Sequence, residues 1–186
     1  MGRAMQPIRD LNQLEEFKRL LAEKDLRNWM LFVLGINIGL RVSDLLPLRV
    51  KDVSGQYLHV IEKKSKKRRR ILLNEALRAE IRRYLDYYDW LGPNDLLFES
   101  NSYRTSGEPI SSVQAYRIMR DAGDALGLDS IGTHTMRKTF GYHFYQRTKD
   151  IATLQLLMNH SSPRVTMKYI GILQDEMDFA MSGFKI

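Results

Sequence analysis

Hydrophobic positions in the first part of this chain follow the repeat of an α-helix. Asp10 can cap a helix at its start, and the apolar residues after it share one helical face: Leu11, Leu14, Phe17 and Leu21. A second, more apolar segment runs from about Leu26 to Gly39, where glycine can adopt the left-handed conformation that ends many helices. The pattern predicts one amphipathic helix followed by a more buried one.

The pattern then changes to short runs with the composition of β-strands. Ser43 is expected to cap a short helix that Pro47 limits. Three strands are predicted after it: Val50–Val53, Tyr57–Ile61 and Arg68–Leu73. Because a Ser-Gly pair and a basic run supply the connecting turns, we expect a small three-stranded antiparallel sheet.

Beyond the strands the helical repeat returns. Four polar residues are placed to cap further helices: Asn74, Ser111, Asp150 and Ser162. The helix from Ser111 is expected to end at Gly127 and the helix from Asp150 to run through Met158, with another helix after His134. Pro163 fits the first turn of a helix that precedes Tyr169. The last apolar residues also keep helical spacing: Leu173, Met177, Ala180 and Phe184.

These elements predict one mainly α domain with a small three-stranded antiparallel β-sheet, an α+β fold. No repeat and no low-complexity linker divides the chain. We expect the domain to cover residues 10–171, with a linker or cloning remnant at residues 1–9 and a tail at residues 172–186.

Composition excludes several classes of protein. A chain of 186 residues with 44% hydrophobic and 27% charged residues is typical of a soluble globular domain. The longest apolar run, Trp29–Leu40, has 12 residues and contains Asn37, so it is too short to span a bilayer. The chain has no cysteine, which excludes disulfides and cysteine-based metal sites and fits a reducing cytosol.

The positive charge of the chain is concentrated in one segment, called here the basic ridge. The net charge is +7, and seven basic residues stand among the eight at positions 63–70: Lys63, Lys64, Lys66, Lys67, Arg68, Arg69 and Arg70. The remainder of the chain is formally neutral, so the ridge predicts a polyanion partner. A solvated charge run or a localisation signal is the alternative, but the β-rich flanks favour an ordered hairpin.

Six residues in separate motifs could together handle an anion and attack it: Arg41, Lys64, His134, Arg137, His160 and Tyr169. Guanidinium groups bind phosphate oxygens in pairs and stay charged at any relevant pH. Two of them could supply what a magnesium ion supplies elsewhere, so this set needs neither a metal nor a bound cofactor. Taken alone, Arg41 could instead pair with Asp44, which follows it by three residues.

Tyr169 is the candidate nucleophile. A free tyrosine has a pKa near 10, so only about 0.1% is phenolate at neutral pH, and attack requires a nearby base or positive field. A histidine can act as such a base because it titrates near neutrality. Without these neighbours Tyr169 would be an ordinary core or surface aromatic. The other histidines, His59 and His143, are expected to be structural.

The motifs resemble those of the tyrosine recombinase (phage-type integrase) family. Arg41 stands in Gly-Leu-Arg-Val-Ser-Asp-Leu-Leu, His134 and Arg137 form His-x-x-Arg, and Tyr169 follows the His160 of Asn-His-Ser-Ser by nine residues. The resemblance covers roughly residues 10–180. It implies that both arginines clamp the phosphate, that His134 accepts the tyrosine proton and that His160 donates to a nonbridging oxygen. Asp44 occupies the place of a family acidic residue and would orient Arg41.

The resemblance also implies a lysine in the hairpin as general acid for the departing 5′ oxygen. Counting back from residues 71–73 points to Lys64, and Lys63, Lys66 and Lys67 are the competitors. Strand alternation would place Lys63 and Lys64 on opposite faces, so that only one enters the site. The other basic residues of the ridge are expected to contact DNA.

The function implied is site-specific DNA recombination or integration through a 3′-phosphotyrosine intermediate, without metal, ATP or cofactor. Double-stranded DNA would be the partner, with a homotetramer on DNA for the full protein and a monomer for this domain alone. The location would be the cytoplasm, at the nucleoid when bound. Family members usually have an N-terminal DNA-clamping domain and often donate the tail to a neighbour. The alternatives are a catalytically idle DNA-binding module and a type IB topoisomerase-like enzyme.

Overall fold

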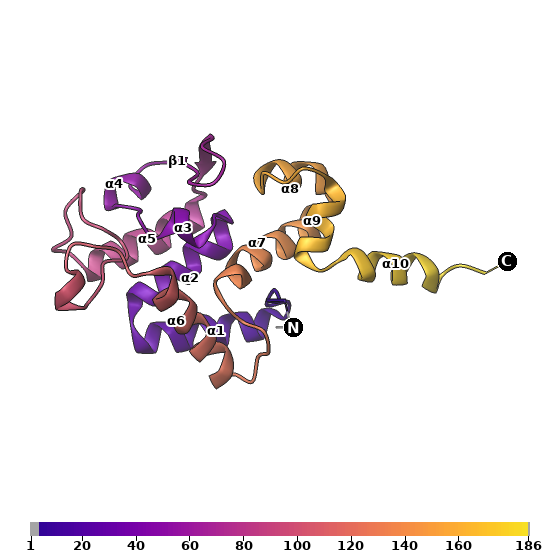
Figure 1. Ribbon diagram of the computed structural model, residues 1–186, viewed down its shortest axis with the longest axis horizontal. Helices are drawn as coiled ribbons and strands as arrows, with labels where there is room; N and C mark the ends of the chain where they lie inside the picture. The colour runs from indigo at the N-terminus through magenta and orange to yellow at the C-terminus, as the bar shows by residue number, and fades with distance from the viewer. Residues whose placement is uncertain (1–3, 186) are drawn as a thin grey trace.

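The buried helix α2 (Leu26–Ile38) is the central element of the fold, and α1, α5 and α7 all contact it. The computed structural model describes residues 4–185, and Figure 1 shows the order of the elements along the chain. The remaining helices are α1 (Leu11–Lys24), α3 (Val42–Leu45), α4 (Val50–Val53), α5 (Glu75–Tyr87), α6 (Ser112–Ala125), α7 (Thr133–Thr148), α8 (Ile151–Leu157), α9 (Pro163–Ile170) and α10 (Leu173–Ser182), with the 3₁₀ turn η1 at Tyr103–Thr105.

Most helix starts lie where the sequence predicts them, because the caps are local. A capping side chain accepts a backbone N–H from the first turn at each of these predicted positions: Asp10, Asn74, Ser111, Asp150 and Ser162. Gly39 ends α2 in the left-handed conformation, with φ at 62°. Ser43 is not a cap, however; Arg41 occupies the N-cap position of α3.

The sheet has two strands rather than the predicted three. Strand β1 (Tyr57–Ile61) pairs antiparallel with β2 (Arg68–Leu72), and Leu58 stands opposite Ile71. The segment Val50–Val53 is the short helix α4 instead of a strand. Its start is stabilised by the carboxylate of Asp52, which accepts the backbone N–H of Arg49 at 2.8 Å.

A second, smaller hydrophobic cluster supports the C-terminal part of the domain. It contains Tyr145, Leu154, Met158, Ile170 and Ile172, from α7 to the start of the tail. Gly141 of α7 lets α9 approach closely, because a Cβ at this position would lie 2.6 Å from Cγ2 of Ile170. Helix α9, which carries Tyr169, therefore rests directly on α7.

The residues just before α1 are packed against the domain, although residues 1–9 were expected to be a linker. The backbone N–H of Ile8 donates to the hydroxyl of Thr139 at 2.9 Å, and the Ile8 side chain is 2% exposed. Arg9 donates to the carbonyl of Gly171 at 2.7 Å. Residues 1–3 of that expected linker lie outside the described residues.

The tail keeps the predicted helical pattern as α10, which points away from the rest of the domain in Figure 1. Its large apolar side chains are exposed: Met177, Phe179, Met181 and Phe184. None of the helices in residues 4–185 is long and apolar enough to cross a membrane.

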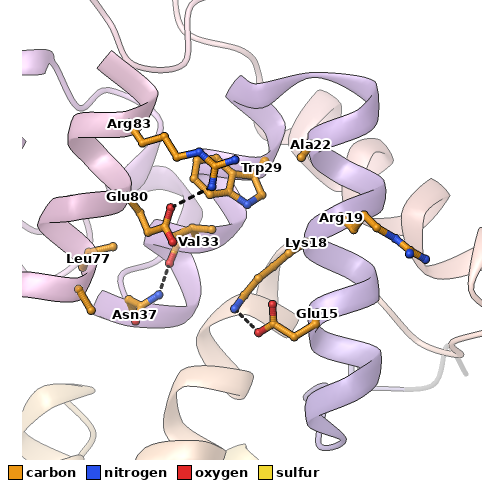
Figure 2. Close-up of a pocket in the computed structure, with 11 residues that line it drawn as sticks. Glu15, Lys18, Arg19, Ala22, Trp29, Val33, Asn37, Leu77, Glu80 and Arg83 are labelled. Carbon is orange, nitrogen blue, oxygen red and sulfur yellow. Dashed lines mark hydrogen bonds and ion pairs between the residues drawn. The ribbon is translucent and has the colours of Figure 1, made fainter. Parts of the chain in front are cut away.

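A separate cleft lies between α1, α2 and α5. Figure 2 shows Trp29, Val33 and Asn37, which share one face of α2, between Lys18 of α1 and Glu80 of α5. None of the six candidate site residues lines this cleft.

Candidate active site

Arg137 lies at the centre of the candidate site and forms hydrogen bonds to the ends of two helices, α2 and α8. Its side chain is 2% exposed, and its guanidinium donates to the carbonyls of Gly39 and of Met158, the latter at 2.5 Å. Burial lowers the pKa of Arg137 to about 10, although the neighbouring Tyr169 partly opposes this. Arg137 therefore remains a cation at neutral pH and links the end of α2 to the end of α8.

Arg41 follows the turn at Gly39, and it is the N-cap residue of α3. Its guanidinium lies 3.6 Å from a carboxylate oxygen of Glu62 and has one buried nitrogen without a hydrogen-bond partner among the described residues. A buried donor without a partner is costly in free energy. This nitrogen has only the longer ion pair with Glu62, so it could still donate a hydrogen bond to an anion.

Tyr169 and His134 are in direct contact. The phenolic oxygen of Tyr169 lies 3.1 Å from Nδ1 of His134, although the two residues come from α9 and α7. Burial raises the pKa of Tyr169, and the charges of Arg137 and Arg41 act in the opposite direction. The phenol is accordingly neutral in the free protein and has a proton acceptor beside it.

His134 is suited to accept that proton because its ring is held neutral. Although the side chain is exposed, desolvation by the surrounding protein lowers its pKa below 6.5, and the charge of Arg137 acts in the same direction. Above that pKa the neutral ring offers one nitrogen as an acceptor.

His160 lies on the other side of Tyr169, with 5.0 Å between the ring centroids. Its Nδ1 is 3.2 Å from the hydroxyl of the buried Thr166. Burial, with added repulsion from Arg137 and Arg41, lowers the pKa of His160 to about 4. The ring is therefore neutral at pH 7, and Nε2 is the nitrogen left for a ligand.

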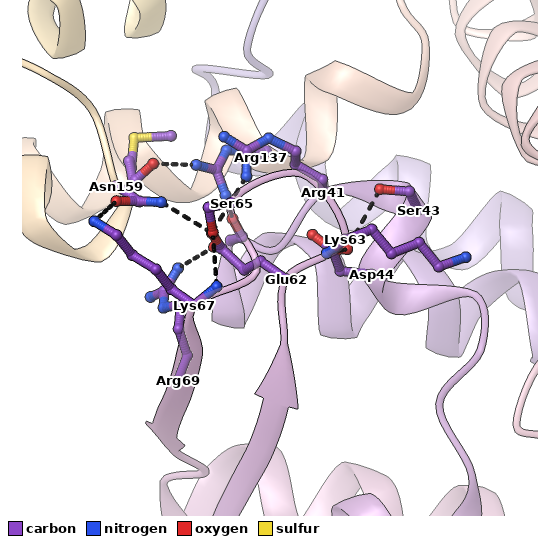
Figure 3. Close-up of polar contacts among 12 residues, drawn as sticks. Arg41, Ser43, Asp44, Glu62, Lys63, Ser65, Lys67, Arg69, Arg137 and Asn159 are labelled. Atoms are coloured by element: carbon purple, nitrogen blue, oxygen red, sulfur yellow. Dashed lines mark hydrogen bonds and ion pairs between the residues drawn. The ribbon is translucent and has the colours of Figure 1, made fainter.

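Glu62 is a residue of this cluster that the sequence motifs do not reveal. Its side chain is 0% exposed, and it accepts hydrogen bonds from Arg69 at 2.9 Å, Ser65 at 2.6 Å and Asn159 at 3.0 Å, as Figure 3 shows. Burial alone would raise its pKa, but these three hydrogen bonds and the charge of Arg69 lower it to about 2. Glu62 is thus ionised at any pH at which the protein would function.

Asp44 contacts both the segment that carries Arg41 and the hairpin turn. The carboxylate beside Arg41 is Glu62, whereas Asp44 is 1% exposed and accepts the backbone N–H of Lys63 at 2.9 Å. Asp44 therefore holds the start of the hairpin turn, and its backbone N–H donates to the carbonyl of Arg41 at 2.8 Å. No hydrogen bond or ion pair between the Asp44 and Arg41 side chains is found among the described residues. A lone glutamate before a basic run gives no signal from which the role of Glu62 could be predicted.

Two of the hairpin lysines, Lys63 and Lys64, make no side-chain contact with the site among the described residues. Lys63 and Lys64 lie in the turn after β1, so strand alternation does not set their directions as predicted. Figure 3 shows the Lys63 side chain extending away from Arg137 and Asn159. Lys64 is exposed, and within residues 4–185 it has no hydrogen bond or ion pair.

The rest of the basic ridge is ordered, as its flanks predict. Arg69 points inward to Glu62, and Arg70 lies over the ring of Tyr57 at 4.6 Å. Lys67 donates to the side chain of Asn159 at 3.2 Å. Lys66 and Arg68 are exposed, and Lys66 has a φ of 57° in the turn.

Lys138 is a second neighbour of Tyr169 that the sequence reasoning missed. It follows His134 by one helical turn on α7, and its ammonium lies 5.2 Å from the centre of the Tyr169 ring. Burial lowers the pKa of Lys138. The i, i+4 spacing from a candidate histidine is a signal that could have found it.

The other histidines have no part in this cluster. His59 is exposed on β1, and His143 contacts the carbonyl of Ile8 at 3.0 Å. In the described part of the chain, no three histidine, aspartate or glutamate side chains gather closely enough to hold a metal ion.

The arrangement of a tyrosine, two histidines and two arginines agrees with the family indicated by the motifs, and a direct comparison decides the matter. Residues 9–176 match the phage integrase family. The chain belongs to this family. Its members in these comparisons are named integrases and recombinases, so the chain is by family an enzyme that breaks and rejoins DNA.

Two relatives in the phage integrase family differ in length and in sequence identity to this chain. The chain is 54% identical over 181 residues to the "Probable integrase/recombinase YoeC" of Bacillus subtilis, and the match covers 97% of each chain. It is 32% identical to the tyrosine recombinase XerA of Pyrococcus furiosus, over 85% of this chain and 56% of that relative. The chain thus spans about half the length of XerA and nearly all of YoeC.

Solved structures share the fold. The crystal structure of XerA recombinase has a TM-score of 0.75 at 21% identity, covering 100% of this chain and 68% of that one. A post-cleavage complex of XerH with the difH substrate has a TM-score of 0.73 at 20% identity, covering 97% of this chain and 54% of that one. These likenesses confirm the mainly helical recombinase fold predicted from the motifs.

Proposed function

We propose that this chain cleaves and rejoins double-stranded DNA at specific sites, with Tyr169 as the nucleophile. The observation that carries the proposal is the 3.1 Å contact between the Tyr169 hydroxyl and His134, beside two arginines. XerH, a structural neighbour, is described in complex with its DNA substrate before and after cleavage.

In the first step, Tyr169 attacks the scissile phosphorus as His134 accepts the phenolic proton. Arg41 and Arg137 bind the nonbridging oxygens, on which negative charge accumulates in the transition state. His160 donates from Nε2 to one of those oxygens. The products are a 3′-phosphotyrosine and a 5′ hydroxyl.

Departure of the 5′ oxygen requires a proton, because an alkoxide is a strongly basic leaving group. We assign that proton to Lys64, with Lys63, Lys66 and Lys67 as the competing donors. Since the turn is exposed in the free protein, the lysine reaches the phosphate only when DNA lies against the hairpin.

Rejoining reverses these steps. The 5′ hydroxyl of a partner strand attacks the phosphotyrosine, which conserves the energy of the original bond, so no ATP is consumed. The basic ridge holds the DNA backbone through phosphate contacts. This reaction takes place in the cytoplasm, at the nucleoid.

Recombination between two duplexes uses four protomers, and the domain alone is monomeric. The exposed apolar residues of α10 supply a surface for a neighbouring protomer, because exposed apolar groups gain free energy on burial. The alternative for the tail, packing on its own domain, receives no support from the position of α10 in Figure 1.

A suicide DNA substrate, nicked so that the 5′ product diffuses away, tests the proposal. A covalent protein–DNA adduct that survives denaturation is expected. A catalytically idle module would bind DNA and give no adduct. A type IB topoisomerase-like enzyme would give the adduct and relax supercoils without exchanging strands between duplexes.

A further inference from the structure

Glu62 and Asn159 form a polar bridge between two parts of the domain that are 97 residues apart in sequence. The amide of Asn159 donates to Oε2 of Glu62 at 3.0 Å and accepts from the ammonium of Lys67 at 3.2 Å. Glu62 and Lys67 are on the hairpin, whereas Asn159 lies between α8 and α9 and immediately precedes His160. The bridge therefore spans the candidate site.

The two ends of this bridge belong to different hydrophobic clusters. The hairpin residues Leu58 and Ile71 pack in the main core, and α8 and α9 pack through Leu154, Met158 and Ile170 in the smaller cluster. Figure 1 shows the hairpin and the α8–α9 pair as separate projections on the same side of α7. Polar contacts such as the Glu62–Asn159 bond consequently contribute to their relative position.

Glu62 also lies beside the proposed phosphate site without being exposed to it. Oε2 of Glu62 is 3.6 Å from the guanidinium of Arg41, and Arg69 donates a hydrogen bond to the other oxygen, Oε1. A fixed carboxylate next to Arg41 attracts the guanidinium and repels an incoming phosphate. Any benefit of Glu62 for the reaction must therefore come from geometry and not from binding of the anion.

We propose that Glu62 is a positioning residue that latches the hairpin to the α8–α9 turn through Asn159. The latch holds Arg41 and His160, which come from opposite sides of the site, at the spacing of one phosphate. This role rests on the proposed function, and the latch itself is a property of the free protein. The rival interpretation is that Glu62 serves only as a counter-ion for Arg69.

Asn159→Gly tests the latch in the absence of DNA. Asn159 has a φ of 48°, which glycine adopts freely, so this change removes the amide without backbone strain. Hydrogen exchange of the backbone amides in α8 and α9 is expected to accelerate about tenfold. This factor corresponds to the free energy lost when one hydrogen bond to a charged group is removed. Ser130→Gly is the matched control, because Ser130 has a φ of 61° and is not part of the bridge.

Unchanged exchange in Asn159→Gly, or equal acceleration of α8 and α9 in Ser130→Gly, would overturn the latch. The first result would show that the bridge contributes nothing to the position of α8 and α9. The second would show that the effect belongs to glycine and not to removal of the amide.

Cleavage of the suicide substrate then tests the positioning role. Glu62→Ala and Asn159→Gly should each slow adduct formation by about tenfold or more, while DNA affinity stays the same or rises for Glu62→Ala. The double variant should be no slower than the slower single variant, because both changes break one bridge. Two results would support the counter-ion interpretation and overturn the proposal. One is a double variant in which the effects of the two substitutions on the cleavage rate add in full, and the other is a parallel loss of DNA affinity and cleavage rate.

These outcomes are separable from a failure of the proposed function. If the unmodified chain forms no adduct, the recombinase mechanism is refuted, and the exchange measurements still decide whether the latch exists. If the adduct forms and Asn159→Gly forms it equally fast, only the positioning role is refuted.

Discussion

The hydroxyl of Tyr169 lies 3.1 Å from Nδ1 of His134. This distance is that of a hydrogen bond, so the candidate nucleophile and its base form a pair. Lys138 and His160 flank the same phenol ring. Three side chains from α7 and the α8–α9 turn thus surround the phenol of Tyr169.

The first prediction concerns the protonation of the two histidines. In an NMR titration of the free protein, the ring of His160 should titrate near pH 4 and the ring of His134 below pH 6.5. Both shifts are caused chiefly by burial and next by Arg137, so Arg137→Gln should move both midpoints upward. A midpoint of either residue above 6.5 in the unmodified chain would refute this account of the site.

The same shifts predict how stability depends on pH. Histidine in the unfolded chain has a pKa of about 6.5, whereas His160 in the folded chain has a pKa of about 4. Between these values the unfolded chain binds more protons, so stability is lost as the pH falls from about 6.5. The urea midpoint should be lower at pH 5 than at pH 7, and His160→Gln should show a smaller difference.

The second prediction concerns the close approach of α7 and α9. A methyl group at Gly141 would lie 2.6 Å from Cγ2 of Ile170, the residue after Tyr169. Gly141→Ala should therefore lower the free energy of unfolding by about 1–3 kcal/mol, the usual cost of overpacking. It should also reduce adduct formation more than DNA affinity, because α9 carries the nucleophile and not the basic ridge.

Gly55→Ala is the control for this change. The nearest atom to a Cβ at Gly55 is 3.8 Å away, so the methyl group has room. Equal effects of the two substitutions on adduct formation would show that α7–α9 packing does not position Tyr169.

The third prediction concerns the basic ridge. Neutralising Lys66, Lys67 and Arg68 together should weaken binding to all DNA sequences alike. The plot of log affinity against log salt should flatten by up to about 0.9 for each phosphate that the protein no longer neutralises. A variant with Lys18, Arg19 and Lys24 of α1 neutralised has the same charge change away from the hairpin. If both variants give the same slope as the unmodified chain, the ridge does not contact the DNA backbone.

The fourth prediction concerns the general acid. Lys64→Ala should cleave ordinary DNA slowly but cleave DNA with sulfur at the 5′ bridging position well, because a thiolate leaves without a proton. Lys63→Ala should show no such rescue. If Lys63→Ala is rescued instead, the general acid is Lys63 and not Lys64.

Local signals explain which parts of the fold could be predicted. The helix caps and the turn at Gly39 depend on residues a few positions apart, so the sequence is sufficient for them. The strand predicted at Val50–Val53 was wrong because valines at both ends favour a strand, whereas the segment is held as a helix partly by bonds from Val50 and Lys51 to the distant carbonyls of Asp95 and Pro93.

The candidate site, too, could be predicted only where its residues lie in local sequence motifs. Arg41, His134, Arg137, His160 and Tyr169 lie in motifs, and the structure brings them together. Glu62 was missed because its function depends on Asn159, which is 97 residues away and gives no periodic or motif signal. The directions of the hairpin lysines could not be predicted, because they lie in a turn where strand alternation does not apply.

The most direct test of the central claim is adduct formation by Tyr169→Phe. This change removes one oxygen and little packing, so DNA affinity, which comes mainly from phosphate contacts, should survive. On a suicide substrate the unmodified chain should form a covalent adduct that maps to the peptide containing Tyr169, and Tyr169→Phe should form none. An adduct of undiminished yield with Tyr169→Phe would contradict the account, because another residue would then be the nucleophile.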